Sequence, residues 1–132
     1  MMAATLAEGT TTLLNVAREP EVADLANMLN SMGAKIDGAG SDEITIQGVK
    51  KLSGTSFQIP ADRIEAGTYL AAAAVTKGDI KIEGINPNRL MNVIDKLIHT
   101  GAKVDYDENS ISFSMTNAVS YTHLTLPTKS SG

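Results

Sequence analysis

Residues 59–74 read Ile59-Pro60-Ala61-Asp62-Arg63-Ile64-Glu65-Ala66-Gly67-Thr68-Tyr69-Leu70-Ala71-Ala72-Ala73-Ala74. Pro60 predicts the end of a strand, because proline has no N–H group to donate to a sheet. Asp62 favours the start of a helix, because its carboxylate can accept the first backbone N–H groups. One face of the predicted helix holds six residues, Ile64, Gly67, Thr68, Ala71, Ala72 and Val75. The helix is apolar nearly all round, which predicts burial. Asp62 and Arg63 at its exposed start are therefore candidates for chemistry.

The chain has 132 residues, of which 42% are hydrophobic and 20% are charged. This composition is typical of a soluble globular protein with one modest core or two small ones. The net charge is −4, and residues 1–118 carry −5 because Lys129 is the only charged residue that follows them. An acidic chain of this kind argues against a nonspecific nucleic-acid surface, so no nucleic-acid partner is predicted.

The absence of cysteine excludes disulfides, thiolate catalysis and cysteine-based zinc sites for these residues. His99 and His123 are the only imidazoles, too few for a metal site, and neither a metal nor a cofactor is predicted. No apolar run reaches the length of a membrane span, so no membrane association is predicted. Residues 1–8 lack the features of a signal peptide and look like the last turns of a helix whose beginning is missing. We therefore expect a fragment.

The first half of the chain predicts two helices and four strands. One helix ends over residues 5–8, and a second opens at Pro20 and stops at Gly33. The predicted strands are residues 10–16, 34–37, 43–47 and 53–59. Residues 38–42 begin Gly-Ala-Gly but lack the Gly-Lys pair and the helix of a phosphate-binding loop, so they are interpreted as a turn.

The second half repeats the first. Gly33-Ala34-Lys35-Ile36-Asp37 matches Gly101-Ala102-Lys103-Val104-Asp105, an offset of 68 residues. A strand at residues 78–83, a helix opened by Pro87 and a strand at 110–113 complete the correspondence. Each unit therefore predicts helix, strand, helix, strand, strand. Because the loops are short, we expect mostly antiparallel strands and an α+β fold.

Residues 119–132 match neither unit. They resemble the in-frame translation of a sequencing-library transposon end, and we interpret them as a non-native or disordered tail without function.

Three separated blocks carry a resemblance to a known family. They are residues 3–11 with 17–22, residues 33–36, and the run Ile59-Pro60-Ala61-Asp62-Arg63-Ile64-Glu65-Ala66-Gly67-Thr68. In collinear order they resemble the UDP-N-acetylglucosamine enolpyruvyl transferases, over residues 1–118. Enolpyruvylshikimate phosphate synthase shares the fold and reaction type and is less similar in the third block.

The resemblance implies an inside-out α/β barrel of six repeated βαβαββ units in two domains, of which about two units are present here. Residues 1–59 would be the last unit of one domain. Residues 60–118 would be a unit of the second domain, after a crossing near Pro60 and Asp62 at the interdomain cleft.

The resemblance also implies a cytoplasmic enzyme. The family transfers the enolpyruvyl group of phosphoenolpyruvate to UDP-N-acetylglucosamine and releases phosphate, in peptidoglycan synthesis. It implies that Asp62 handles a proton or orients phosphoenolpyruvate, and that Arg63, Glu19 and Arg18 contribute to substrate binding. The family's cysteine-bearing loop, its Lys-Asn pair and several phosphate-binding arginines lie outside this chain. We therefore expect the remainder of the protein to be needed, and the fragment alone to be inactive.

Structural interpretations stand beside these roles. In this alternative Asp62 serves only as a helix cap, which contributes about 1 kcal/mol. Arg63 would then form an ion pair with Glu65 or Glu19, and Arg18 and Glu19 would belong to a solvated loop. Two other functions remain open from the sequence, a relative of enolpyruvylshikimate phosphate synthase and a non-catalytic βα repeat module that binds RNA or a protein.

Overall fold

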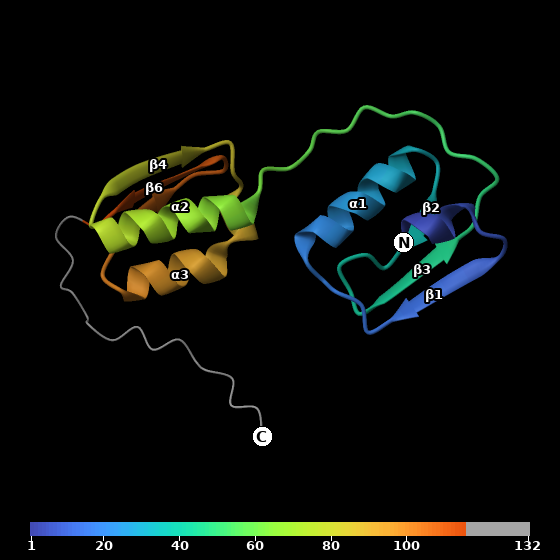
Figure 1. The fold of residues 1–132 in the computed structure, drawn as a ribbon, viewed down its shortest axis with the longest axis horizontal. Helices are drawn as coiled ribbons and strands as arrows, with labels where there is room; N and C mark the ends of the chain where they lie inside the picture. The colour runs from blue at the N-terminus through green and yellow to red at the C-terminus, as the bar shows by residue number, and fades with distance from the viewer. Residues whose placement is uncertain (116–132) are drawn as a thin grey trace, which may run out of the picture. The chain divides into compact units, whose positions relative to one another are not determined.

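The computed structural model of the chain describes residues 1–115. The chain divides into two compact units, Met1–Pro60 and Ala61–Gly132, which we call unit 1 and unit 2. Each unit contains a three-stranded antiparallel sheet with helices on one side of it (Figure 1). The α+β class predicted from the sequence is confirmed. The predicted tail, residues 119–132, lies outside the described residues.

Unit 1 is built around the central strand of its sheet. Its elements are η1 (Met2–Leu6), β1 (Thr10–Leu14), α1 (Pro20–Ser31), β2 (Lys35–Asp37) and β3 (Glu43–Gln47). Strand β3 lies between β1 and β2 and pairs with both in antiparallel register. Alternate residues of β3, Ile44 and Ile46, are buried, whereas Glu43 and Gln47 are exposed. This period of two turns one face of the sheet toward α1, whose Ala26 and Leu29 complete the core.

Helix α1 begins and ends where the sequence predicts. Pro20 occupies its first turn, where no intrahelical partner is needed for the missing N–H group. Gly33 follows the helix with a φ of 100°, a left-handed conformation that glycine adopts without strain. The N–H group of Ala34 donates to the carbonyl oxygen of Leu29 at 3.0 Å, which satisfies one of the last helical carbonyls.

Unit 2 repeats this arrangement with a longer first helix. Its elements are α2 (Arg63–Thr76), β4 (Asp79–Glu83), η2 (Pro87–Arg89), α3 (Met91–His99), β5 (Lys103–Tyr106) and β6 (Ser110–Ser114). Figure 1 shows α2 and α3 on the same side of the sheet. The core joins both helices to the central strand β6. Its buried residues are Ala66, Leu70, Ala73, Ile85, Leu90, Ile94, Ala102, Ile111 and Phe113.

The predicted internal repeat is confirmed by the topology. The strand order is β1-β3-β2 in unit 1 and β4-β6-β5 in unit 2, so the last strand is central in both sheets. Gly101 follows α3 with a φ of 94°, as Gly33 follows α1. Because antiparallel strands can be joined by short connections, each unit forms the same three-stranded fold.

The strand predicted at residues 53–59 is wrong. Residues 48–62 contain neither helix nor strand. Ser53 donates its N–H group to the carbonyl oxygen of Met32 at 2.7 Å, and Leu52 packs against the core of unit 1. On the edge strand β2, the side-chain amide of Asn30 already bonds both the N–H group and the carbonyl oxygen of Ile36. An extended segment forms no strand unless its backbone groups find a partner strand.

The N-terminal predictions need smaller corrections. The predicted strand at residues 10–16 ends at Leu14, because Asn15 has a φ of 53° and leaves the extended conformation. Val16 then donates its N–H group to the carbonyl oxygen of Asp42 at 3.2 Å instead of continuing the strand. The helix predicted to end over residues 5–8 is the short 3-10 helix η1, which ends at Leu6.

The burial predicted for the helix that begins after Asp62, which is α2, is wrong for one of its sides. The buried residues of α2 are Ala66, Leu70 and Ala73. Ile64 and Val75, on the face predicted to be covered, are 63% and 82% exposed. The sheet and α3 contact only one side of this helix, and no described residue covers the other.

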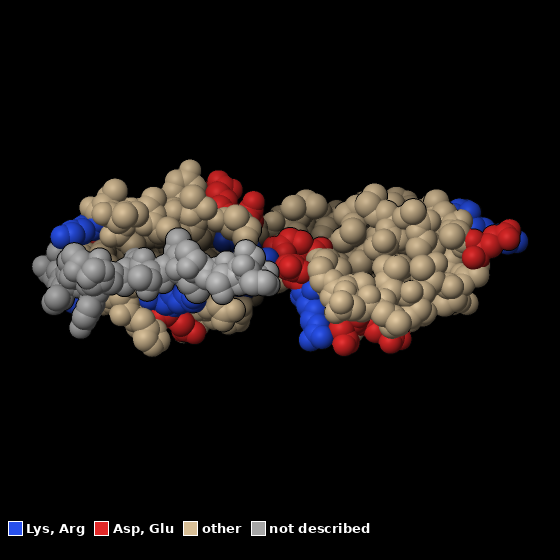
Figure 2. Space-filling model, turned by 60° about the horizontal axis from the view of Figure 1, so that its bottom comes forward, with Lys and Arg blue, Asp and Glu red and all other residues tan. Residues whose placement is uncertain are grey.

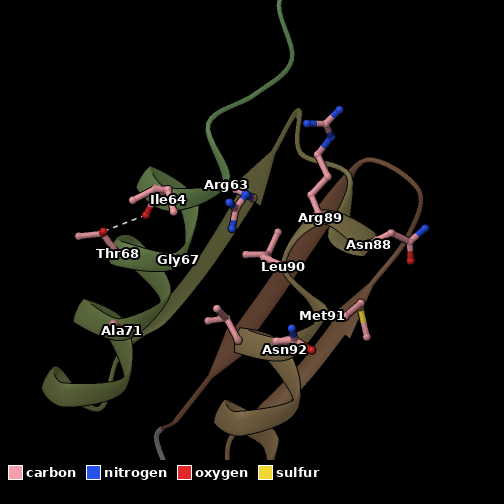
Figure 3. A pocket seen from close by; sticks show the side chains of 11 residues that line it. Arg63, Ile64, Gly67, Thr68, Ala71, Asn88, Arg89, Leu90, Met91 and Asn92 are labelled. Carbon is pink, nitrogen blue, oxygen red and sulfur yellow. Dashed lines mark hydrogen bonds between the residues drawn. The ribbon is translucent and has the colours of Figure 1, made fainter. Parts of the chain in front are cut away.

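The helix predicted from Pro87 onward is divided. Pro87–Arg89 forms a single 3-10 turn, and the α-helix begins only at Met91. Leu90 interrupts the helix with φ −139° and ψ 28°, and its side chain is buried in the core of unit 2. This break turns the side chains of Arg89 and Leu90 in different directions (Figure 3).

Candidate functional site

Asp62 caps the N-terminus of α2. Its Oδ1 atom accepts the N–H group of Ile64 at 2.8 Å and that of Glu65 at 3.1 Å. Asp62 itself has an extended backbone, the conformation of a residue that precedes a helix. The structure therefore confirms the predicted cap. Because one oxygen makes both bonds, the carboxylate of this exposed residue is held in a defined orientation at the start of the helix.

A groove of about 410 Å³ lies in unit 2 between the first turns of α2 and the segment that contains η2 and the start of α3 (Figure 3). Arg63 lies on the α2 side and Arg89 on the η2 side. In Figure 3 the Arg63 guanidinium lies between the two elements, and Arg89 extends from η2 at the same end of the groove. Leu90 points into the groove, and Gly67 contributes no side chain to it.

Arg89 was missed by the sequence reasoning. The available signal was its position two residues after Pro87, which marks a second helix start. The missing information was that the start of α2 and the segment with η2 line one groove, which places Arg63 and Arg89 on two sides of it.

Arg18 and Glu19 lie in unit 1, directly before α1. Arg18 Nη2 is 3.4 Å from Asp42 Oδ2, and both side chains are about two-thirds exposed (63% and 67%). Such an ion pair contributes little to stability because water screens it. Glu19 occupies the N-cap position of α1, and its side chain makes no capping hydrogen bond. Arg18 and Glu19 thus belong to unit 1, whereas Asp62 and Arg63 belong to unit 2.

Two other shallow hollows lie on the polar faces of the sheets. One is lined by Lys35 and Asp37 on β2, and the other by Asp79, Lys81, Lys103 and Asp105 on β4 and β5. Both combine basic and acidic side chains. The groove beside α2 differs, because none of the described residues that line it is acidic.

Two shifted pKa values lie away from the groove. A hydrogen bond of 2.6 Å from Lys81 Nζ to Glu83 Oε1 raises the pKa of Lys81 above its usual range. The Asp107 carboxylate accepts the N–H group of Asn109 at 2.8 Å and the hydroxyl of Ser110 at 2.9 Å, and these bonds lower the pKa of Asp107. Both effects belong to the sheet and its β5–β6 turn, so they stabilise structure rather than poise a reactive group.

The described residues show no features of a nucleic-acid surface, a metal site or a membrane span. On the face of unit 1 seen in Figure 2, acidic and basic side chains lie toward the edges, without a continuous basic area among the described residues. Within residues 1–115, no three His, Cys, Asp or Glu side chains gather closely enough to hold a metal ion. None of the helices in that range is long and apolar enough to cross a membrane.

Comparison with curated proteins identifies close relatives. The chain is 58% identical over 116 residues to UDP-N-acetylglucosamine 1-carboxyvinyltransferase 1 of Legionella pneumophila (strain Lens), covering 87% of this chain and 23% of that protein. It is 53% identical over 117 residues to UDP-N-acetylglucosamine 1-carboxyvinyltransferase of Hydrogenovibrio crunogenus, covering 89% and 28%. A protein of that name from Coxiella burnetii is 56% identical over 115 residues, covering 87% and 26%. The chain thus spans about a quarter of the length of these relatives.

Solved structures show the same fold. The enolpyruvyl transferase NikO from Streptomyces tendae matches with a TM-score of 0.70 at 24% identity, over 84% of this chain and 27% of that one. At this identity the likeness shows the fold alone. The EPSP synthase from Acinetobacter baumannii matches with a TM-score of 0.54 at 30% identity, over 85% of this chain and 27% of that one.

A family model covers nearly the whole chain. The model described as EPSP synthase (3-phosphoshikimate 1-carboxyvinyltransferase) matches residues 1–129. The resemblance read from the three sequence blocks is confirmed by the names of the relatives. The repeated α+β units, the structural neighbours and this match together show that the chain belongs to the EPSP synthase family.

Proposed function

We propose that the chain is part of a cytoplasmic transferase that moves the enolpyruvyl group of phosphoenolpyruvate onto UDP-N-acetylglucosamine, with release of phosphate, in peptidoglycan precursor synthesis. The observation that carries this proposal is the identity of 53–58% to three proteins named UDP-N-acetylglucosamine 1-carboxyvinyltransferase. The remainder of the protein is required, because the chain spans only about a quarter of those relatives.

The proposed reaction is an addition followed by an elimination. The oxygen of a sugar hydroxyl bonds to the central carbon of phosphoenolpyruvate, the methylene carbon gains a proton, and the hydroxyl loses its own. The adduct then loses a proton from the new methyl carbon while its carbon–oxygen bond to phosphate breaks. This releases inorganic phosphate and restores the double bond. Acidic side chains can move these protons and cationic side chains can hold the phosphate and carboxylate, so the proposal includes no cofactor.

Within this reaction we assign Asp62 a part in proton transfer or in orienting phosphoenolpyruvate. Its fixed carboxylate at the start of α2 supports the assignment, because a catalytic group must be held in position. Arg63 is proposed to hold a carboxylate or phosphate of a substrate, since a guanidinium can bind either through two parallel hydrogen bonds. Arg18 and Glu19 are proposed to face the substrates from unit 1. Residues 1–59 and 60–118 would then belong to different domains of the longer protein.

The test uses the longer protein that contains this chain. Phosphate release is measured with phosphoenolpyruvate and UDP-N-acetylglucosamine, for the wild type and for Asp62→Asn. Asparagine is also a good helix cap, so the fold is retained while the negative charge is lost. We expect kcat to fall by about 10²-fold or more. Asp95→Asn, on the exposed side of α3, is the matched control and should retain activity.

Other outcomes separate the alternatives. The family model and the Acinetobacter baumannii structure are described as EPSP synthase, which favours a second candidate acting on 3-phosphoshikimate. Phosphate release with that acceptor, and none with UDP-N-acetylglucosamine, would replace the proposed function by the second candidate. Release with neither acceptor would favour a non-catalytic repeat module. The 132-residue chain alone is expected to show no transfer activity.

A further inference from the structure

We propose that residues 54–61, which we call the tether, are a cleavage site for an endopeptidase that accepts Phe57 before the bond it cuts. Cleavage there separates unit 1 from unit 2 while both units stay folded. The inference goes beyond the proposed function and does not rest on it. It concerns a segment in which the sequence predicted a strand and to which the structure gives no partner strand.

The first support is the backbone of the tether. The tether contains neither helix nor strand, and its N–H and carbonyl groups form no backbone–backbone hydrogen bond with another described residue (Figure 1). All of its residues are exposed except Phe57 and Pro60, which are half-buried. An endopeptidase must bind several residues in an extended form through their backbone groups, so a free and exposed backbone is its first requirement.

The second support is the contrast with the segments on both sides of the tether. On the N-terminal side, Val49 donates its N–H group to the carbonyl oxygen of Thr5 at 2.8 Å, and Ser53 donates to that of Met32 at 2.7 Å. On the C-terminal side, Asp62 caps α2 through its carboxylate. These bonds define the two ends of the free segment, because each of them would have to break before the flanking backbone could enter a peptidase.

Two other exposed connections are held closed by their own side chains. Ser41 Oγ donates to the carbonyl oxygen of Gly38 at 2.8 Å and accepts the N–H group of Glu43 at 3.2 Å. The Asp107 carboxylate accepts the N–H group of Asn109 at 2.8 Å. A peptidase can bind either turn only after these bonds open, whereas the tether needs no such opening.

The third support is that a cut in the tether removes no contact from either core. The described residues that form the two hydrophobic cores include none from the tether. Each unit also keeps all three strands of its own sheet on its own side of the cut. A boundary in an exposed, polar segment therefore allows both parts to remain folded after the backbone is broken.

Chymotrypsin is the probe, because it cuts after Phe and Tyr. Exposure of the side chain alone favours Tyr69 and Tyr106, which are 55% and 50% exposed, over the half-buried Phe57. Tyr69 lies in α2 and Tyr106 in β5, so a cut there requires that element to open. In the 132-residue chain we expect the bond after Phe57 to be cut at least about 100-fold faster than the bond after either tyrosine. Mass spectrometry identifies each cut within residues 1–115.

Paired variants separate the backbone requirement from the side-chain requirement. Phe57→Ala should slow the first cut by about tenfold or more, and Tyr69→Ala should leave its rate within about twofold. Gln58→Lys places a trypsin site in the tether, and trypsin should cut rapidly after residue 58. Gln47→Lys makes the same change at an exposed position of β3 and should not be cut there, because that backbone is paired on both sides.

The state of the two units after the cut is measured by NMR. The amides of β3 and β6 should keep their chemical shifts and their slow hydrogen exchange. A first cut after Tyr69 or Tyr106, or equal trypsin cutting in Gln58→Lys and Gln47→Lys, would overturn the cleavage site. Loss of the β3 or β6 signals on cleavage would overturn the separation into two folded units. Neither result depends on transferase activity.

Discussion

Asp62 and Glu65 are joined by a hydrogen bond of 3.1 Å, in which the Glu65 N–H group donates to Asp62 Oδ1. The same oxygen accepts the N–H group of Ile64 at 2.8 Å. The residue proposed for catalysis is therefore also the residue that begins α2. A cap and a catalytic carboxylate are compatible, because the cap uses one oxygen and thereby fixes the direction of the other. Substitutions at this position can separate the two roles.

Asp62→Ala should reduce the stability of α2, whereas Asp62→Asn should not. Alanine removes both capping bonds, which costs about 0.5–2 kcal/mol, and asparagine replaces the carboxylate as an equally good cap. The measurement is the hydrogen exchange of the α2 amides in the 132-residue chain. Equal acceleration of exchange in both variants would show that the charge of Asp62, rather than its capping geometry, stabilises the helix.

Gly67→Ala should stabilise unit 2. Glycine inside a helix costs about 0.5–1 kcal/mol relative to alanine. A Cβ atom at this position would lie 4.0 Å from Val93 Cγ1, an ordinary contact distance, so α3 need not move. Chemical denaturation should therefore give a higher free energy of unfolding for the variant. A loss of stability would mean that α2 and α3 approach more closely than the structure shows.

Asn30→Ala should destabilise unit 1. The Asn30 side chain donates to the carbonyl oxygen of Ile36 and accepts its N–H group, both at 2.9 Å. Removing it leaves a backbone donor and acceptor of β2 without these bonds, at a cost of about 1–3 kcal/mol. Asn27→Ala, on the exposed side of the same helix, is the matched control. Denaturation midpoints that fall equally in both variants would contradict a specific role of Asn30.

Gly48→Ala should be much more harmful than Gly54→Ala. A Cβ atom on Gly48 would lie only 1.6 Å from the carbonyl oxygen of Ala7, so the backbone after β3 would have to move away from η1. Overpacking of this kind costs about 1–3 kcal/mol or more. A Cβ atom on Gly54 meets nothing within 4 Å. Thermal unfolding should show a lower midpoint for the first variant alone, and equal midpoints would contradict the close approach.

The stability of unit 2 should fall at acid pH through Asp107. The N–H group of Asn109 and the hydroxyl of Ser110 favour the ionised carboxylate and lower its pKa in the folded state. The contribution is complete above the ordinary aspartate pKa of about 3.9 and is lost as the pH falls through the lowered folded value. Unfolding measured from about pH 5 to about pH 2 should be less steep in Asp107→Asn than in the wild type. Glu108→Gln is the matched control and should keep the steeper loss.

Features encoded by neighbouring residues could be predicted from the sequence. Pro20 and Gly33 bound α1, Asp62 caps α2, and the Gly33 and Gly101 motifs revealed the repeat. Helix caps, turns and the alternation of buried residues along a strand depend on groups only a few positions apart. For the same reason the α+β class and the antiparallel sheets could be predicted.

Contacts between distant residues decided the rest. Residues 53–59 formed no strand, because the Asn30 amide bonds the backbone of β2 at Ile36 and Ser53 bonds the carbonyl oxygen of Met32. Hydrophobicity alone did not reveal which face of α2 meets the core, since nearly every face is apolar. That Arg63 and Arg89 line the same groove was decided by the tertiary structure, which places the start of α2 and the segment with η2 on its two sides. By itself the sequence determined the local elements, their repeat and the resemblance to a family. Only the tertiary structure decided which of those elements meet, because packing depends on the shape of partners far apart in the chain.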